Sequence, residues 1–129
     1  MQVFNASSTM DALWNMFAPL QNEIPIYKQT VDENETDLPQ SYLLLRVDIT
    51  NSPGMFGDGK ALLRLPECDV ILISKTAGAT SDDIHNVNKK KVIALFDGAD
   101  AAYEGYDLGY NDTLKESQYT WTVRFLYGS

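Results

Sequence analysis

The sequence predicts an α+β fold: a two-layer sandwich in which two helices pack on one face of a mostly antiparallel sheet. Three observations lead to this class. Two segments, around residues 8–17 and 81–96, carry apolar residues at helical spacing. Other segments alternate apolar and polar residues with a period of two, as half-buried strands do. Turn-forming residues separate neighbouring strand segments, which favours antiparallel hairpins. The length of 129 residues suits a single domain over 1–129.

The first helix is expected over residues 8–17. Ser8 can cap its N-terminus, and Pro19 limits its length. The residues at the i, i+3, i+4 and i+7 spacing of a buried helix face are Met10, Leu13, Trp14 and Phe17. Residues 24–27 then form a brief strand candidate, and the proline within it favours the edge of a sheet or the start of a strand.

The middle of the chain predicts a long antiparallel hairpin. Residues 42–49 alternate between a firmly buried face and a mixed face. The buried face carries Leu43, Leu45, Val47 and Ile49, and the mixed face carries Tyr42, Leu44, Arg46 and Asp48. Residues 51–59 hold three glycines and a proline, the composition of a wide turn. The returning strand starts at Lys60, is interrupted or bulged at Pro66, and resumes over residues 70–73.

A second helix is expected over residues 81–96. Thr80 or Ser81 can cap it, with two aspartates in its positive first turn, and Gly98 stops it. Its apolar stripe consists of Ile84, Val87, Val92, Leu95 and Phe96. The basic triplet 89–91 is interpreted as a solvated helix face, because one triplet lacks the breadth of a nucleic-acid footprint.

The last part of the chain predicts a second hairpin. Residues 103–110 form a weak strand that contains two glycines, and Asn111 begins the turn. Residues 118–127 alternate strictly, so this strand should bury one face. That face carries Tyr119, Trp121, Val123, Phe125 and Tyr127. We expect Trp121 to lie in the core.

Both helices should cover the same face of the sheet, which leaves the opposite face without helices. Antiparallel sheets can expose one face to water, but Tyr42, Leu44 and Leu126 would then be partly exposed. Apolar side chains in such positions suggest a protein partner.

Composition excludes several classes of protein. The chain is 44% hydrophobic and 22% charged, as soluble globular proteins are, and its apolar runs are too short to span a membrane. Residues 1–5 lack the basic start of a secretory signal. These short runs lead us to expect no membrane partner, and the net charge of −8, which repels a phosphate backbone, leads us to expect no specific nucleic-acid binding. The single cysteine, Cys68, fits a reducing compartment and is interpreted as a small buried apolar residue.

The sequence shows no catalytic or metal-binding signature, so we expect no cofactor, no metal and no enzymatic activity. His85 is the only histidine, and without a nucleophile at a recognisable spacing it is interpreted as a surface residue. The acidic run 32–37 fails as a calcium loop, because Asp37 stands where the glycine belongs and Leu43 where the closing glutamate belongs. A small ferredoxin-like ligand-binding domain or enzyme stays an alternative, since a pocket built from distant residues leaves no sequence motif.

The order of elements adds a family resemblance. A helix precedes Ile24-Pro25-Ile26-Tyr27, an acidic loop precedes the strand at residues 41–45, and Gly57-Asp58-Gly59-Lys60 opens the next strand. A strand at residues 68–75, a helix that ends in Asp97-Gly98, and an aromatic closing strand follow. In this pattern, which spans nearly the whole chain, the sequence resembles the tail terminator, or tail-completion, proteins of long-tailed bacteriophages.

The resemblance implies a structural virion protein without an active site. Such proteins form hexameric rings on the last ring of the tail tube, stop its polymerisation and present a docking surface to the head. The implied partners are further copies of the chain, the major tail tube protein and the head connector or stopper protein. The implied location is the host cytoplasm during assembly and then the neck of the virion, where DNA would pass through the ring. Another neck or head–tail connector protein is the alternative within this class.

We expect two loops to form the protein interfaces. The candidate residues are Met55, Phe56 and Asp58 in the turn at 51–59, and Asp32, Glu33, Glu35 and Asp37 in the acidic loop. Deleting Met55 and Phe56 should leave folding intact and impair assembly.

Overall fold

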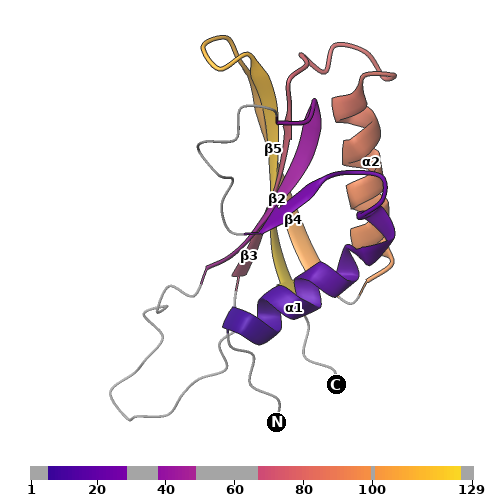
Figure 1. The fold of residues 1–129 in the computed structure, drawn as a ribbon, viewed down its shortest axis with the longest axis vertical. Coiled ribbons are helices and arrows are strands. Elements are labelled where there is room, and N and C mark those ends of the chain that lie inside the picture. The colour runs from indigo at the N-terminus through magenta and orange to yellow at the C-terminus, as the bar shows by residue number, and fades with distance from the viewer. Residues whose placement is uncertain (1–5, 29–37, 49–66, 100, 126–129) are drawn as a thin grey trace.

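The computed structural model describes residues 6–28, 38–48, 67–99 and 101–125 (Figure 1). Over these residues the chain is an α+β sandwich, as the sequence predicts. One layer is a five-stranded, mostly antiparallel sheet, and the other consists of two helices that share one core with it. The elements in chain order are α1 (Ala6–Met16), the short 3₁₀ helix η1 (Ala18–Leu20), β1 (Ile26–Lys28), β2 (Ser41–Asp48), β3 (Glu67–Ser74), α2 (Ile84–Asp97), β4 (Ala101–Asn111) and β5 (Glu116–Phe125).

The strands lie in the order β1-β2-β3-β5-β4, so β1 and β4 form the two edges. β1 runs parallel to β2, and the other neighbours are antiparallel. β1 lies at an edge, as its proline favours, but it covers Ile26–Lys28 in place of the expected 24–27, so Pro25 precedes the strand. The β2–β3 pairing confirms the middle hairpin, although its turn at 51–59 and the segment from Lys60 to Pro66 lie outside the described residues.

The core is a cluster of aromatic and aliphatic side chains between the sheet and the helices. Phe96 of α2 lies at its centre, with its ring 5.8 Å from the ring of Phe17, which follows α1, and 5.8 Å from that of Trp121 in β5. All three side chains are almost wholly buried, so the expectation that Trp121 is a core residue is confirmed. The alternate residues of β2 and β3 that join this cluster are Leu43, Leu45, Val47, Cys68, Val70 and Leu72.

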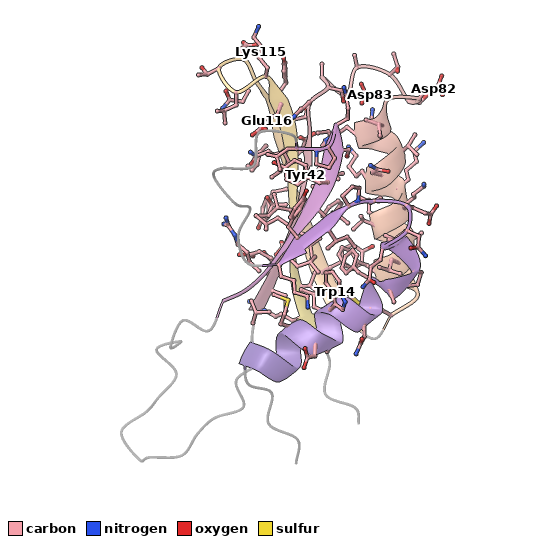
Figure 2. The ribbon with its side chains drawn as sticks, viewed as in Figure 1. Trp14, Tyr42, Asp82, Asp83, Lys115 and Glu116 are labelled. Atoms are coloured by element: carbon pink, nitrogen blue, oxygen red, sulfur yellow. The ribbon has the colours of Figure 1, made fainter. Side chains whose placement is uncertain are left out.

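The helix ends differ from the expected ones. α1 begins at Ala6, so Ser8 lies within the helix and is not its cap. The N-cap of α2 is Asp83, and neither Thr80 nor Ser81 has that position. Asp83 has extended backbone dihedrals, and its carboxylate accepts bonds from the His85 backbone amide, at 2.9 Å, and from the Thr76 hydroxyl. Asp83 lies at the start of α2 (Figure 2). A carboxylate accepts a hydrogen bond from an amide of the first turn more strongly than a hydroxyl does, which explains the shift.

The buried line of α2 also differs from the expected apolar stripe. Val92 and Phe96 are buried as expected, but Ile84 and Val87 are exposed. The inward positions of the first two turns are occupied by the polar residues His85 and Asn88, both about 5% exposed or less. They can lie there because serines on the sheet provide hydrogen-bond partners.

The helix-free face of the sheet is more buried than expected at its centre. Tyr42 is 5% and Leu44 is 4% exposed, so the prediction that they are partly exposed is wrong. In the strand register Leu44 lies between Tyr27 and Ile71, and the Tyr27 ring meets the Tyr42 ring edge-on at 5.6 Å. Side chains of neighbouring strands therefore shield this centre. Leu126 lies outside the described residues.

Candidate functional site

The interface residues predicted from the sequence are not among those that the structure describes. Met55, Phe56 and Asp58 fall within 49–66, and Asp32, Glu33, Glu35 and Asp37 fall within 29–37. Their role at a protein interface stays a prediction, and the candidate functional site consists of other residues.

Exposed apolar side chains gather on the β4–β5 hairpin. Large apolar side chains of the described residues that are at least about a third exposed are Tyr103, Tyr106, Leu108, Tyr110 and Leu114 on the hairpin and Ile84 and Val87 on α2. Tyr106 is 55%, Leu108 62% and Leu114 59% exposed. We call residues 106–116 the arm. A concentration of apolar surface on one element marks a contact site more often than scattered single residues do.

The arm belongs to an edge strand. β4 pairs with β5 along one side, and the described part of the chain places no strand on its other side. At 11 residues it is long for an edge strand, and its free backbone amides and carbonyls can pair with another chain. Proteins usually shield such an edge, and a protein partner is one way to do so.

A bulge in β4 interrupts its pairing with β5 within the arm. The register with β5 shifts between Asp107 and Gly109, which leaves Leu108 without a partner across the strands. The Gly109 amide donates a 2.8 Å bond to the Asp107 carboxylate, and Gly109 has a φ of 73°, a left-handed conformation that suits glycine. This hydrogen bond and the conformation of Gly109 stabilise the bulge, which leaves Leu108 exposed to solvent.

The tip of the arm is ordered by its own turn. The Asn111 side-chain oxygen accepts bonds from the amides of Thr113, at 2.9 Å, and Leu114, at 3.0 Å, and its backbone carbonyl accepts the Lys115 amide at 2.7 Å. These bonds confirm Asn111 as the start of the turn. Ser74, the last residue of β3, pairs with Ser117, so the arm extends beyond β3 (Figures 1 and 2).

The base of the hairpin is held to α2. Gly105 leaves room for the Tyr119 ring, since a β-carbon at this position would lie 2.7 Å from two atoms of that side chain. Lys89 of α2 places its ammonium 5.0 Å from the centre of the same ring. The Tyr103 hydroxyl donates a 2.6 Å bond to Asp97, and this bond is the main reason that the pKa of Tyr103 is raised. These contacts attach the base of the hairpin, from which the arm extends, to α2.

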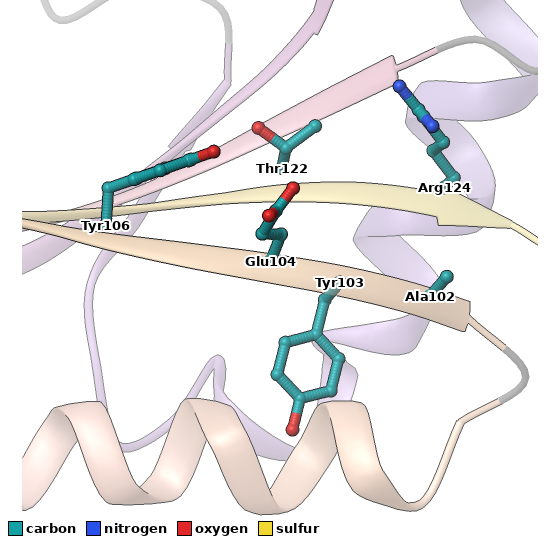
Figure 3. A pocket seen from close by; sticks show the side chains of 6 residues that line it. All are labelled: Ala102, Tyr103, Glu104, Tyr106, Thr122 and Arg124. Atoms are coloured by element: carbon teal, nitrogen blue, oxygen red, sulfur yellow. The ribbon is translucent and has the colours of Figure 1, made fainter.

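A shallow depression of about 480 Å³ lies on β4 and β5, mainly on the face opposite the helices (Figure 3). Its lining consists of Ala102, Tyr103, Glu104, Tyr106, Thr122 and Arg124. Figure 3 shows Glu104, Tyr106 and Arg124 on this face, whereas the Tyr103 ring points to α2. An exposed tyrosine ring in line with an acidic and a basic residue is a surface suited to protein contact.

A polar network lies on the other side of the sheet and corrects the prediction for His85. This residue is 4% exposed, so it is not a surface residue. Its Nδ1 lies 2.8 Å from the Ser74 hydroxyl, which lies 2.8 Å from the Ser41 hydroxyl, and Asn88 donates a 2.9 Å bond to Ser41. Burial, followed by the charge of Lys89, lowers the pKa of His85, so the ring is neutral near pH 7.

A histidine beside a serine hydroxyl also occurs in enzymes with a serine nucleophile. Here Ser74 is fully buried and Ser41 is 3% exposed, so a substrate in solvent has no access to either hydroxyl in this structure. The network instead joins α2 to β2 and β3 by satisfied polar contacts. In the sequence, the signal for this network was the helical spacing of His85 and Asn88, which places them on the same face as Val92 and Phe96.

Cys68 and the lysine triplet 89–91 are the other residues that the sequence singled out. Cys68 is fully buried, as predicted, and burial, with a smaller contribution from Asp69, raises the pKa of its thiol to about 12. Of the lysine triplet only Lys90 is exposed and free of these contacts, because Lys91 pairs with Glu23 at 3.1 Å and Lys89 lies over Tyr119.

Among the described residues, no three His, Cys, Asp or Glu side chains form a potential metal site. No described helix combines the length and apolarity needed to cross a membrane.

Comparison of the chain with protein-family models, with curated proteins and with solved structures finds no match.

Proposed function

We propose that this chain is a structural protein of a bacteriophage virion that caps the tail tube. Copies of the chain form a ring on the last ring of the tube, stop its polymerisation and offer a docking surface to the head connector. The observation that carries the proposal is the arm, an ordered extension of a long edge strand with exposed apolar side chains. The α+β sandwich agrees with the resemblance to tail terminator proteins.

The energetics of the arm support a role in assembly. Burying a large apolar side chain stabilises a complex by about 1.5–3 kcal/mol when it starts fully exposed. Tyr106, Leu108 and Leu114 are each a little over half exposed, so each would contribute about 1 kcal/mol or more on contact. Their ordered backbone lowers the entropy cost of binding. This role needs no reaction centre and no cofactor.

Charge supports the same role. A net charge of −8 on each copy would give a ring a strongly acidic surface. An acidic lumen repels the phosphate backbone, so DNA would pass through without adhering. The proposed location is the host cytoplasm during assembly and the neck of the finished virion.

The test combines oligomeric state with tube length. Light scattering on the purified chain should show a species near six times the 14.4 kDa monomer, alone or after tail tubes are added. Adding the chain to the tail tube protein encoded in the same genome, while that protein polymerises, should shorten the tubes and leave a cap visible by electron microscopy. A chain that stays monomeric and leaves tube length unchanged would refute the proposal.

A further inference from the structure

We infer that the arm of one copy docks on the outer face of α2 in the next copy. This inference rests on the proposed function, because it names the contact that would build the ring. The outer face of α2 consists of Ile84, Val87, Lys90 and Ala94, all of which are exposed. The structure places none of the described elements over it.

The outer face of α2 is the second apolar surface of the chain. Ile84 is 42% and Val87 is 36% exposed, and they lie one turn apart on the helix. The opposite side of α2 packs against the sheet of the same copy, where His85, Asn88 and Phe96 are buried. Because this inner side is held to the sheet, the outer face points away from its own core and is free for a second copy.

The charges of the two surfaces are complementary. The arm carries three carboxylates, Asp107, Asp112 and Glu116, and one lysine, Lys115. The helix α2 carries three lysines, at 89–91; Lys90 lies on the outer face, whereas Lys89 lies over Tyr119 and Lys91 pairs with Glu23. In a chain with a net charge of −8, Lys90 gives this outer face a positive charge. Contact between arm and helix therefore joins apolar surface to apolar surface and acidic residues to basic ones.

The symmetric alternatives are disfavoured by the same charges. Pairing β4 with β4 across a two-fold axis would bring two acidic arms together, and pairing the outer face of α2 with itself would bring Lys90 toward Lys90. Like charges brought together at an interface suppress association. An arm-to-helix contact uses two different surfaces of each copy, so it repeats from copy to copy and closes into a ring where the rotation permits.

Charge reversal tests this contact. Asp112 and Lys90 are exposed, and we would compare Asp112→Lys, Lys90→Glu and the wild type by light scattering at low salt, where surface charges are least screened. Each variant alone should lose the assembled species, because positions 90 and 112 of the contact then carry like charges. A mixture of the two variants should regain it, because each contact then joins opposite charges in an alternating ring. Asp11→Lys, an exposed charge reversal on α1, is the matched control and should assemble normally.

An apolar pair gives a second readout. Leu114→Ser on the arm and Val87→Ser on the outer face of α2 should each abolish the assembled species, while circular dichroism shows a folded chain. The assay is run at the concentration that assembles the wild type. Assembly that survives both substitutions, or a mixture of charge variants that stays monomeric, would overturn the inference.

The outcomes separate this inference from the proposed function. If the wild type forms rings and caps tubes while all these variants also do so, the arm-to-helix contact is wrong and the capping role stands. If the wild type neither assembles nor caps tubes, the capping role itself is wrong. If the wild type binds tubes as single copies and the arm variants lose only that binding, the arm contacts the tube protein and the inference is overturned.

Discussion

Acidification should destabilise the fold through His85. Its ring is 4% exposed and its pKa is lowered in the folded chain, chiefly by burial and next by Lys89, against smaller opposing effects of Asp107 and Asp83. Above its ordinary pKa of 6.5 the ring is neutral in both the folded and the unfolded chain. Below that pH the unfolded chain binds a proton first, so the free energy of unfolding falls as the pH falls.

The size of this effect has an upper limit. One proton taken up only by the unfolded chain lowers the free energy of unfolding by at most about 1.4 kcal/mol for each pH unit. Between about pH 7.5 and about pH 5.5 the ring can therefore cost up to about 1.4 kcal/mol, about three quarters of it below pH 6.5. Asp83, whose pKa is lowered chiefly by its bond from Thr76, loses its contribution only in more acidic solution, below its ordinary 3.8.

Urea unfolding followed by the fluorescence of Trp14 and Trp121 measures this free energy at each pH. The control is His85→Asn, which removes the titration and keeps an amide able to hydrogen-bond to Ser74. Acid also reduces the repulsion within a chain of net charge −8, so the difference between wild type and variant is the quantity to compare. His85 is the only histidine, which makes the assignment direct. Equal pH dependence in the two proteins would refute the buried, neutral ring.

Three substitutions test the packing. Trp121→Ala should lower the free energy of unfolding by about 3–5 kcal/mol, because it removes a buried ring beside Phe96, and an unchanged melting temperature would contradict the core assignment. Gly105→Ala should cost about 1–3 kcal/mol, because the new β-carbon would lie 2.7 Å from Tyr119, and a melting temperature equal to that of the wild type would show that this ring moves freely. Lys115→Gly should raise stability by about 0.5–1 kcal/mol in urea unfolding, because Lys115 has a φ of 54° and relief of that conformation outweighs the entropy cost of glycine; a lower stability would show that the turn does not hold it there.

Periodicity in the sequence predicted the elements that meet the core. The alternation of residues 42–49 and 118–127 correctly assigns Leu43, Leu45 and Trp121 to the buried face. It misassigned Tyr42 and Leu44, because burial on the second face depends on which strands lie beside β2. A period-two pattern carries no information about neighbours that are distant in the chain.

The candidate site was less predictable. The sequence showed a weak strand at 103–110, but the interface was expected in loops that lie outside the described residues. Nothing in the spacing of Tyr106, Leu108 and Tyr110 indicates that β5 would insert between β3 and β4 and leave β4 at the edge. Local pattern specifies a strand, whereas its place in the sheet follows from long-range pairing.

The sequence by itself determined the class of the fold, the order of helices and strands, and most of the apolar core, because these follow from side-chain periods of two and 3.6. Only the tertiary structure decided that Asp83 caps α2, that His85 and Asn88 are buried against serines, and that the arm is exposed. The cap depends on Thr76, a residue outside the helix, the buried Asn88 depends on Ser41, far away in the chain, and the exposure of the arm depends on the order of the strands. A polar residue becomes a core residue, and an apolar one a contact surface, according to what the folded chain places beside it.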